Sequence, residues 1–180
     1  SAAASSSVLP AGSSTRQAII ENQLAGSVGA VDTPLPTQLG GSCVSANGAP
    51  LPLLFVSDEQ INAQMPFGSV GPVSMQVHTR SGISDIFVKQ VDPAAPAIFG
   101  GRGPDSNRYA AIFREDNTLS TLSNPLRPNE VAVIYLTGLG GVSPVMIAGE
   151  RASETILTRT ATEPMVEIGG VAGEVQFAGL

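Results

Sequence analysis

The 180-residue chain has one cysteine, one histidine and no tryptophan, and only 4% of its residues are aromatic. With Cys43 alone, no intramolecular disulfide can form, so the chain is not a disulfide-stabilised scaffold. One histidine and one cysteine fall short of the three or four ligands that a zinc site takes. The scarcity of aromatic residues means that any core must be filled by Val, Ile, Leu and Ala.

Charge is also scarce, at 13% of residues, and the formal net charge is −6. Phosphate binding needs clustered Lys and Arg, whereas the nine basic residues are scattered along the chain, which excludes nucleic acid as a partner. No apolar run reaches the roughly 18 residues that a membrane span needs. The Ser/Ala-rich start is typical of a linker or a mature N-terminus, and the sequence favours a secreted or cell-surface protein.

Glycine and proline are abundant instead, with 20 and 14 residues. They interrupt the chain every few residues, which leaves room for short strands and little room for helices. We therefore predict an all-β fold, arranged as two immunoglobulin-like antiparallel β-sandwich modules. The expected strands are residues 43–46, 51–56, 60–65, 73–79, 83–91, 109–113, 131–137, 154–160, 165–168 and 173–177.

Two of these segments alternate clearly between apolar and polar residues. Because side chains of a strand point alternately to its two faces, one set should face the core and the other the solvent. The set expected inside comprises Ile61, Ala63, Met65, Val73, Met75 and Val77. The set expected in solvent comprises Gln60, Asn62, Gln64, Ser74, Gln76 and His78.

The chain divides at a Gly-rich loop, residues 100–108. We predict a flexible or strand-donating N-terminal segment (residues 1–26), a first module (27–99) and a second module (100–180). An internal repeat supports this division: residues 44–56 match residues 166–178 without a gap, with Gly48 aligned to Gly170. About 40 residues complete the first module after Phe55 but only three follow Phe177, its counterpart in the second copy, so we expect the second module to lack its closing strands within this chain.

Several phrases together resemble an uncharacterised family, the Solibacter-type C-terminal domain of acidobacterial secreted proteins. The resemblance runs from about residue 22 to residue 180. It rests on residues 34–41, 52–57, 60–66, 95–99, 124–125, 133–140, 168–172 and 177–180. It implies an immunoglobulin-like fold and export, often at the C-terminal end of larger surface proteins, and it implies no catalytic residue.

The sequence offers little chemistry. A Ser-His-Asp triad would have to use His78, which lies on the polar face of an alternating strand. The glycines at 138–141 follow a strand but lack the lysine of a phosphate loop. Asp105 to Asn107 could contribute calcium ligands, yet hairpin turns use the same residues. We predict no catalytic residue, no cofactor and no metal, hence no enzyme.

Three functions stay open. The first is a non-catalytic structural or adhesive protein of a bacterial surface. The second is a self-assembling subunit of an extracellular filament, joined to other copies by β-strand complementation. The third is a carbohydrate-binding module with a surface polysaccharide as ligand. The candidate strand donor is the only sizeable apolar group of the N-terminal segment, formed by Ala18, Ile19, Ile20 and Leu24. Cys43 is a candidate intermolecular contact.

Overall fold

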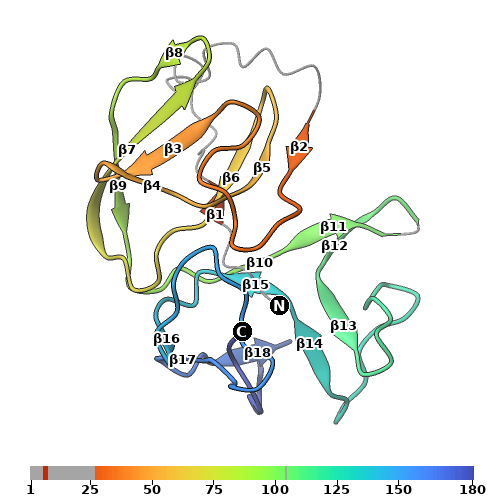
Figure 1. Cartoon of the computed structure of the whole chain (residues 1–180). Coiled ribbons are helices and arrows are strands. Elements are labelled where there is room, and N and C mark those ends of the chain that lie inside the picture. Colours follow the sequence, from red (N-terminus) through yellow and green to blue (C-terminus); the bar gives the residue numbers. More distant parts are fainter. Residues whose placement is uncertain (1–5, 8–26, 104) are drawn as a thin grey trace.

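The computed structural model describes residues 6–7, 27–103 and 105–180. Within these residues there is no helix, and every strand pair is antiparallel. Figure 1 shows the N-terminal half (residues 27–99), with two larger sheets, beside the C-terminal half (residues 100–180), with small ones. The all-β prediction is therefore confirmed for the described part of the chain.

The N-terminal half contains two sheets. The first has the strand order β1-β6-β5-β2, and the second has the order β4-β3-β7-β8, with β9 also paired to β7. Their strands are β1 (Ser6–Ser7), β2 (Val28–Gly29), β3 (Cys43–Ala46), β4 (Ala49–Pro50), β5 (Leu53–Val56), β6 (Ile61–Ala63), β7 (Gly71–Thr79), β8 (Gly82–Ile83) and β9 (Phe87–Val91).

Both sheets contribute side chains to one aliphatic core. Its buried members are Val44, Ala46, Leu51, Leu53, Val56, Ala63, Val73 and Met75. Ile61, Met65 and Val77 are partly buried against this cluster, so every residue expected inside does pack there. Burying such side chains contributes roughly 1.5–3 kcal/mol for each large one, which makes this cluster the main source of stability.

Gln64 is the exception to the predicted alternation. It was expected in solvent, but its side chain is only 3% exposed. Its Oε1 accepts a hydrogen bond of 2.6 Å from the backbone N–H of Gly149, a residue of the C-terminal half. The prediction was wrong because a polar group can be buried where a distant segment supplies its partner.

The predicted strand at residues 83–91 is divided into β8 and β9. Between them Ser84 is buried and bonds to Val77 twice: its N–H donates to the carbonyl of Val77, and its Oγ accepts from the N–H of Val77. His78 lies opposite Ile83 and Met75 lies opposite Phe87. The segment from β8 to β9 therefore has one residue more than the part of β7 with which it pairs. This is a β-bulge, which the apolar pattern of the segment did not reveal.

The C-terminal half consists of separate two-stranded sheets, β11-β12, β13-β14, β16-β17 and β18-β19, and its strand β15 pairs with β10 at the end of the N-terminal half. Their strands are β10 (Ala97–Ile98), β11 (Gly100–Arg102), β12 (Arg108–Ala110), β13 (Ile112–Arg114), β14 (Ala132–Ile134), β15 (Leu136–Thr137), β16 (Val142–Ser143), β17 (Arg159–Thr160), β18 (Val166–Ile168) and β19 (Val171–Gly173). The strands expected at 109–113 and 131–137 are both interrupted, at Ala111 and Tyr135, which bond to each other. Of the strand expected at 154–160 only Arg159–Thr160 is a strand, and of the strand expected at 173–177 only Gly173 is.

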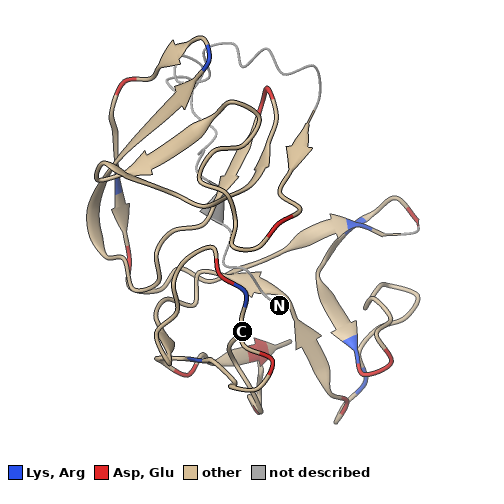
Figure 2. Cartoon of the chain, in the orientation of Figure 1, with Lys and Arg blue, Asp and Glu red and all other residues tan. Residues whose placement is uncertain are grey.

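Backbone hydrogen bonds join the halves in two regions, around β10 and β15 and at Gly149. The segment before β10 runs along the segment after β15, where the N–H of Ala95 donates to the carbonyl of Gly138. Gly149 lies against the N-terminal half, and its carbonyl accepts from the N–H of Leu35 at 2.8 Å. Acidic and basic residues are spread over the strands, turns and loops of both halves (Figure 2), without a basic stripe in the described part.

Candidate interaction surface

The same β-hairpin occurs once in each half. In the first copy, β3 and β4 are joined by Asn47 and Gly48, with φ angles of 51° and 80°. In the second, β18 and β19 are joined by Gly169 and Gly170, with φ angles of 60° and 82°. Two positive φ angles are typical of the tight turns that suit the twist of a hairpin. The repeat found in the sequence is thus also a repeat of structure.

The strand register of the two hairpins is identical as well. Ala46 pairs with Ala49 in the first copy, and Ile168, 122 positions after Ala46, pairs with Val171 in the second. The segments that follow also behave alike. Val56 of β5 pairs with β2, and in the C-terminal half the N–H of Thr160 donates to the carbonyl of Ala178.

The two copies differ at their outer edge. In the first, all four residues of β3 pair with β7, from Cys43 opposite His78 to Ala46 opposite Met75. In the second, β18 pairs with β19 alone, and no other strand in the described part of the chain lies along it. A two-stranded hairpin is marginally stable by itself in water. The outer edge of β18 is thus a sheet edge with unused backbone groups.

Exposure at matched positions follows this difference. Val44 and Ala46 are 0% and 8% exposed beneath their neighbouring strands. Ile168, which corresponds to Ala46, is 51% exposed, and Met165, which precedes β18, is 99% exposed. Val166, which corresponds to Val44, is half-buried, so the matched positions are more exposed in the second copy than in the first.

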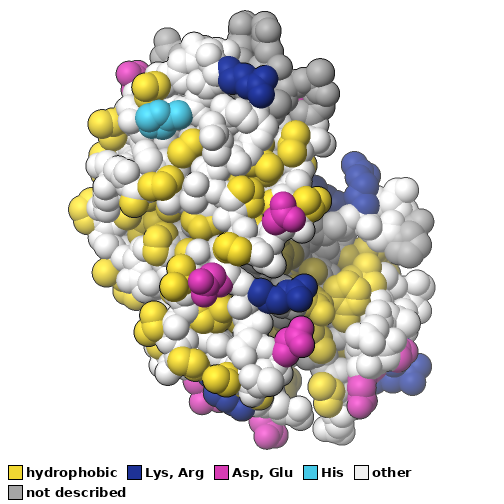
Figure 3. Space-filling view, viewed as in Figure 1, with side chains coloured by type: hydrophobic (Ala, Val, Ile, Leu, Met, Phe, Trp, Pro, Cys, Tyr) yellow, Lys and Arg dark blue, Asp and Glu magenta, His cyan; other side chains and the backbone are white. Residues whose placement is uncertain are grey.

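This holds for the C-terminal half as a whole. Of the nine buried hydrophobic residues in the described part, it contributes only Val142. It also holds most of the exposed large apolar side chains, among them Val145, Ile147, Ile168 and Val171. Figure 3 shows hydrophobic side chains in the hollow between the halves. Because large exposed apolar patches often serve in binding, this half is the candidate interaction surface of the chain.

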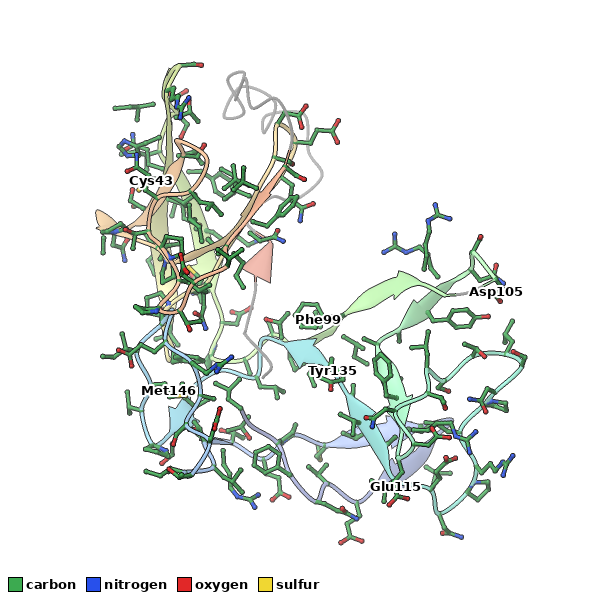
Figure 4. All side chains as sticks on the ribbon, turned by 45° about the vertical axis from the view of Figure 1, so that its right-hand side comes forward. Cys43, Phe99, Asp105, Glu115, Tyr135 and Met146 are labelled. Atoms are coloured by element: carbon green, nitrogen blue, oxygen red, sulfur yellow. The ribbon has the colours of Figure 1, made fainter. Side chains whose placement is uncertain are left out.

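One aromatic contact gives part of this half its order. Phe113 of β13 packs edge-on against Tyr135, with ring centroids 5.5 Å apart and planes at 87°. The N–H of Phe99 donates to the carbonyl of Tyr135, and Figure 4 places both residues near the junction of the halves. These contacts position β13 and β14 without closing a core.

A half-buried ion pair fixes the loop between β13 and β14. Arg114 and Glu130 approach to 2.5 Å, and Arg114 also donates to the side chain of Asn124. The second carboxylate oxygen of Glu130 accepts from the N–H of Arg127. The hydrogen bond from Arg114 lowers the pKa of Glu130. Every partner in this cluster is a neighbour in the fold, so its role is structural.

The tip of the β11-β12 hairpin is a second polar cluster. Asp105 accepts hydrogen bonds from the hydroxyl of Tyr109 at 2.6 Å and from the side-chain amide of Asn107 at 2.8 Å. The bond from Tyr109 lowers the pKa of Asp105 more than that from Asn107. The carboxylate of Asp105 therefore stabilises the turn, which is the role that the sequence offered as the alternative to calcium binding. Among the described residues, no three His, Cys, Asp or Glu side chains gather as metal ligands would.

The candidate site residues from the sequence fall in two places. Cys43 is a free, half-buried cysteine of β3, directly opposite His78. The only cysteine and the only histidine are therefore neighbours, a pairing that needs the strand register to be seen. The strand-donor candidates Ala18, Ile19, Ile20 and Leu24 lie outside the described residues, so their role stays a prediction. Sequence analysis missed Gln64 and Gly149, whose contact joins segments 85 residues apart.

Comparisons with known proteins add no information about this surface. No family model, curated protein or solved structure matches the chain. Within the residues that the structure describes, no helix is long and apolar enough to cross a membrane.

Proposed function

We propose that this chain is a non-catalytic structural or adhesive protein of the bacterial cell exterior, built from immunoglobulin-like sandwich modules and assembled through β-strand addition. The observation that carries the proposal is the contrast between the two copies of one hairpin. The first is covered by β7 and contributes to a core, whereas the second has an open edge and exposed apolar residues.

The energetics support assembly. A strand of about six residues would bring some three apolar side chains, each contributing roughly 1.5–3 kcal/mol on burial. Small domains are stable by only about 5–15 kcal/mol in total. A strand of this size therefore accounts for a large share of the stability of a module, and a half without it gains much from binding one.

The immunoglobulin-like assignment is supported by the N-terminal half. Its two antiparallel sheets of short strands share one aliphatic core, as in sandwiches of that class. The resemblance to the Solibacter-type family leads in the same direction and adds export to the cell surface.

The non-catalytic part of the proposal is supported by the acidic residues with lowered pKa values. The carboxylates of Asp105, Asp116 and Glu130 each accept hydrogen bonds from neighbouring side chains that order a turn or a loop. Ordinary structural contacts account for these shifts, and a catalytic arrangement is not needed to explain them.

A filament of copies is the second candidate, and one observation favours it. Ser6 and Ser7 form β1 and pair with Ala63 and Asn62 of β6. A segment remote in sequence therefore already adds to a sheet edge of the N-terminal half. The same kind of addition between copies, at the open edge of the C-terminal half, would join subunits end to end.

The test is the association of the full chain. Sedimentation velocity over a hundredfold range of concentration should show species larger than the monomer, and amide exchange of residues 158–180 should slow as they form. A monomer at every concentration, with slow exchange in that segment, would mean that the C-terminal half is complete without a partner. The proposal would then fail.

A further inference from the structure

The outer edge of β18 repeats an edge whose occupant is known. On β3 that occupant is β7, antiparallel, with Val44 opposite Val77 and Ala46 opposite Met75. Since the two hairpins share turn conformation and register, a strand added to β18 would find the same geometry.

The backbone groups that would bind it can be assigned. Residues of a hairpin alternately turn their N–H and C=O groups toward the partner strand and away from it. Val44 faces the β4 side, because its carbonyl accepts from the N–H of Leu51 at 2.8 Å, so Ser45 faces β7. In the repeat, Val166 corresponds to Val44, and Glu167 therefore presents its N–H and C=O to the open edge.

The side chains define the chemistry of the occupant. Apolar residues are required beside Val166 and Ile168, as Val77 and Met75 stand beside Val44 and Ala46. Glu167 lies between them, exposed and without an ion pair in the described part of the chain. A basic or amide side chain opposite its carboxylate completes the pairing, at the position that Gln76 has in β7.

We propose that the outer edge of β18 binds an extended peptide strand of the β7 pattern, with apolar residues opposite Val166 and Ile168 and a basic or amide residue opposite Glu167. The assignment rests on the proposed function, since it names the edge and the kind of strand through which assembly takes place. Backbone pairing supplies the affinity, and the alternate side chains fix the register.

The probe is a synthetic peptide with the sequence of residues 71–80, together with a version carrying Gln76→Lys. Both should bind the full chain at one per chain and slow amide exchange at Glu167, and the lysine peptide should bind more tightly. Glu167→Pro removes the outward N–H from an edge position where proline is tolerated, so it should weaken both peptides at least tenfold. Its far-ultraviolet circular dichroism and urea midpoint should match the wild type.

A charge reversal gives a second variant that needs no backbone change. Glu167→Lys should invert the preference, so that a peptide with Gln76→Glu binds more tightly than the lysine peptide. Equal binding by wild type, Glu167→Pro and Glu167→Lys would overturn the assignment. So would peptide binding that leaves amide exchange at Glu167 unchanged while exchange of β7 becomes faster, because the peptide would then be replacing β7 beside β3 in the N-terminal half.

The failures of the two proposals are distinguishable. If the full chain self-associates and Glu167→Pro changes neither that association nor peptide binding, assembly stands and the β18 assignment is refuted. If the chain stays monomeric while the peptides bind as described, the β18 assignment stands and assembly between copies is refuted.

Discussion

The contact between Gln64 and Gly149 provides a sharp test of how the halves are joined. Gln64→Met keeps the length and volume of the side chain but removes the oxygen that accepts from the N–H of Gly149. That N–H is then buried without a partner. Leaving a buried donor unsatisfied costs about 1–3 kcal/mol, more than the 0.5–1.5 kcal/mol of an average hydrogen bond.

We therefore expect Gln64→Met to lower the free energy of unfolding by about 1–3 kcal/mol, of the total of about 5–15 kcal/mol typical of a small domain. Gln60→Met is the matched control, because Gln60 is an exposed residue directly before β6, whereas Gln64 directly follows that strand. Its change should stay within about 0.5 kcal/mol. Urea unfolding followed by circular dichroism measures both, and amide exchange of Gly149 should be faster in Gln64→Met alone.

The slope of the urea transition also tests whether the two halves unfold together. If Gln64 couples the halves, the variant should unfold in two steps or with a reduced slope, because the slope follows the surface exposed in one cooperative event. Equal midpoints for Gln64→Met and Gln60→Met, with unchanged slopes, would show that the buried hydrogen bond does not join the halves. The reasoning from burial would then be refuted.

Two further predictions concern the C-terminal half. Gly138→Ala should destabilise the protein by at least about 2 kcal/mol more than Gly169→Ala, since both have positive φ but only at Gly138 would a Cβ overlap a backbone oxygen, that of Ala95; similar urea midpoints would contradict the close approach. The hydrogen bond from Arg114 lowers the pKa of Glu130 in the folded state below its ordinary value of 4.5. Its ionised form therefore stabilises the fold above that pH, and this contribution is lost as the pH falls through the lowered value. The difference in urea midpoint between wild type and Glu130→Gln should accordingly be present at neutral pH and shrink as the pH falls below 4.5; a difference independent of pH would exclude the ion pair as its source.

The parts of the fold that sequence predicts well are those fixed by local residues. Alternation assigned the inward faces of Val73 and Met75 correctly, because a period of two leaves no choice once one face is apolar. Asn47 and Gly48 form the tight turn of the first hairpin with positive φ angles, which both residue types tolerate, so the turn depends on local sequence alone. In both cases the information lies within a few residues of the feature.

The parts that sequence missed depend on residues far apart in the chain. The burial of Gln64 needs Gly149, and the interruption of the strand at Tyr135 follows its hydrogen bond to Ala111. The strand expected at 173–177 ends at Gly173, because no neighbour in the described part extends its ladder. The sequence predicted that the second module lacks strands, whereas the open outer edge of β18 can be recognised only from the register of both hairpins.

The repeated hairpin separates what the local sequence decides from what its neighbours decide. A Cβ added at Gly48 would meet no atom, and one at Gly170 would meet only the distant carboxylate of Glu167, so these glycines serve the positive φ angle and not close packing. The turn therefore forms in both halves without help from its surroundings. Burial does not follow automatically, since Ala46 is covered and Ile168 is half exposed in the same conformation. The same hairpin conformation thus forms in each half, and the presence or absence of a strand such as β7 beside it decides whether its apolar residues are buried or exposed.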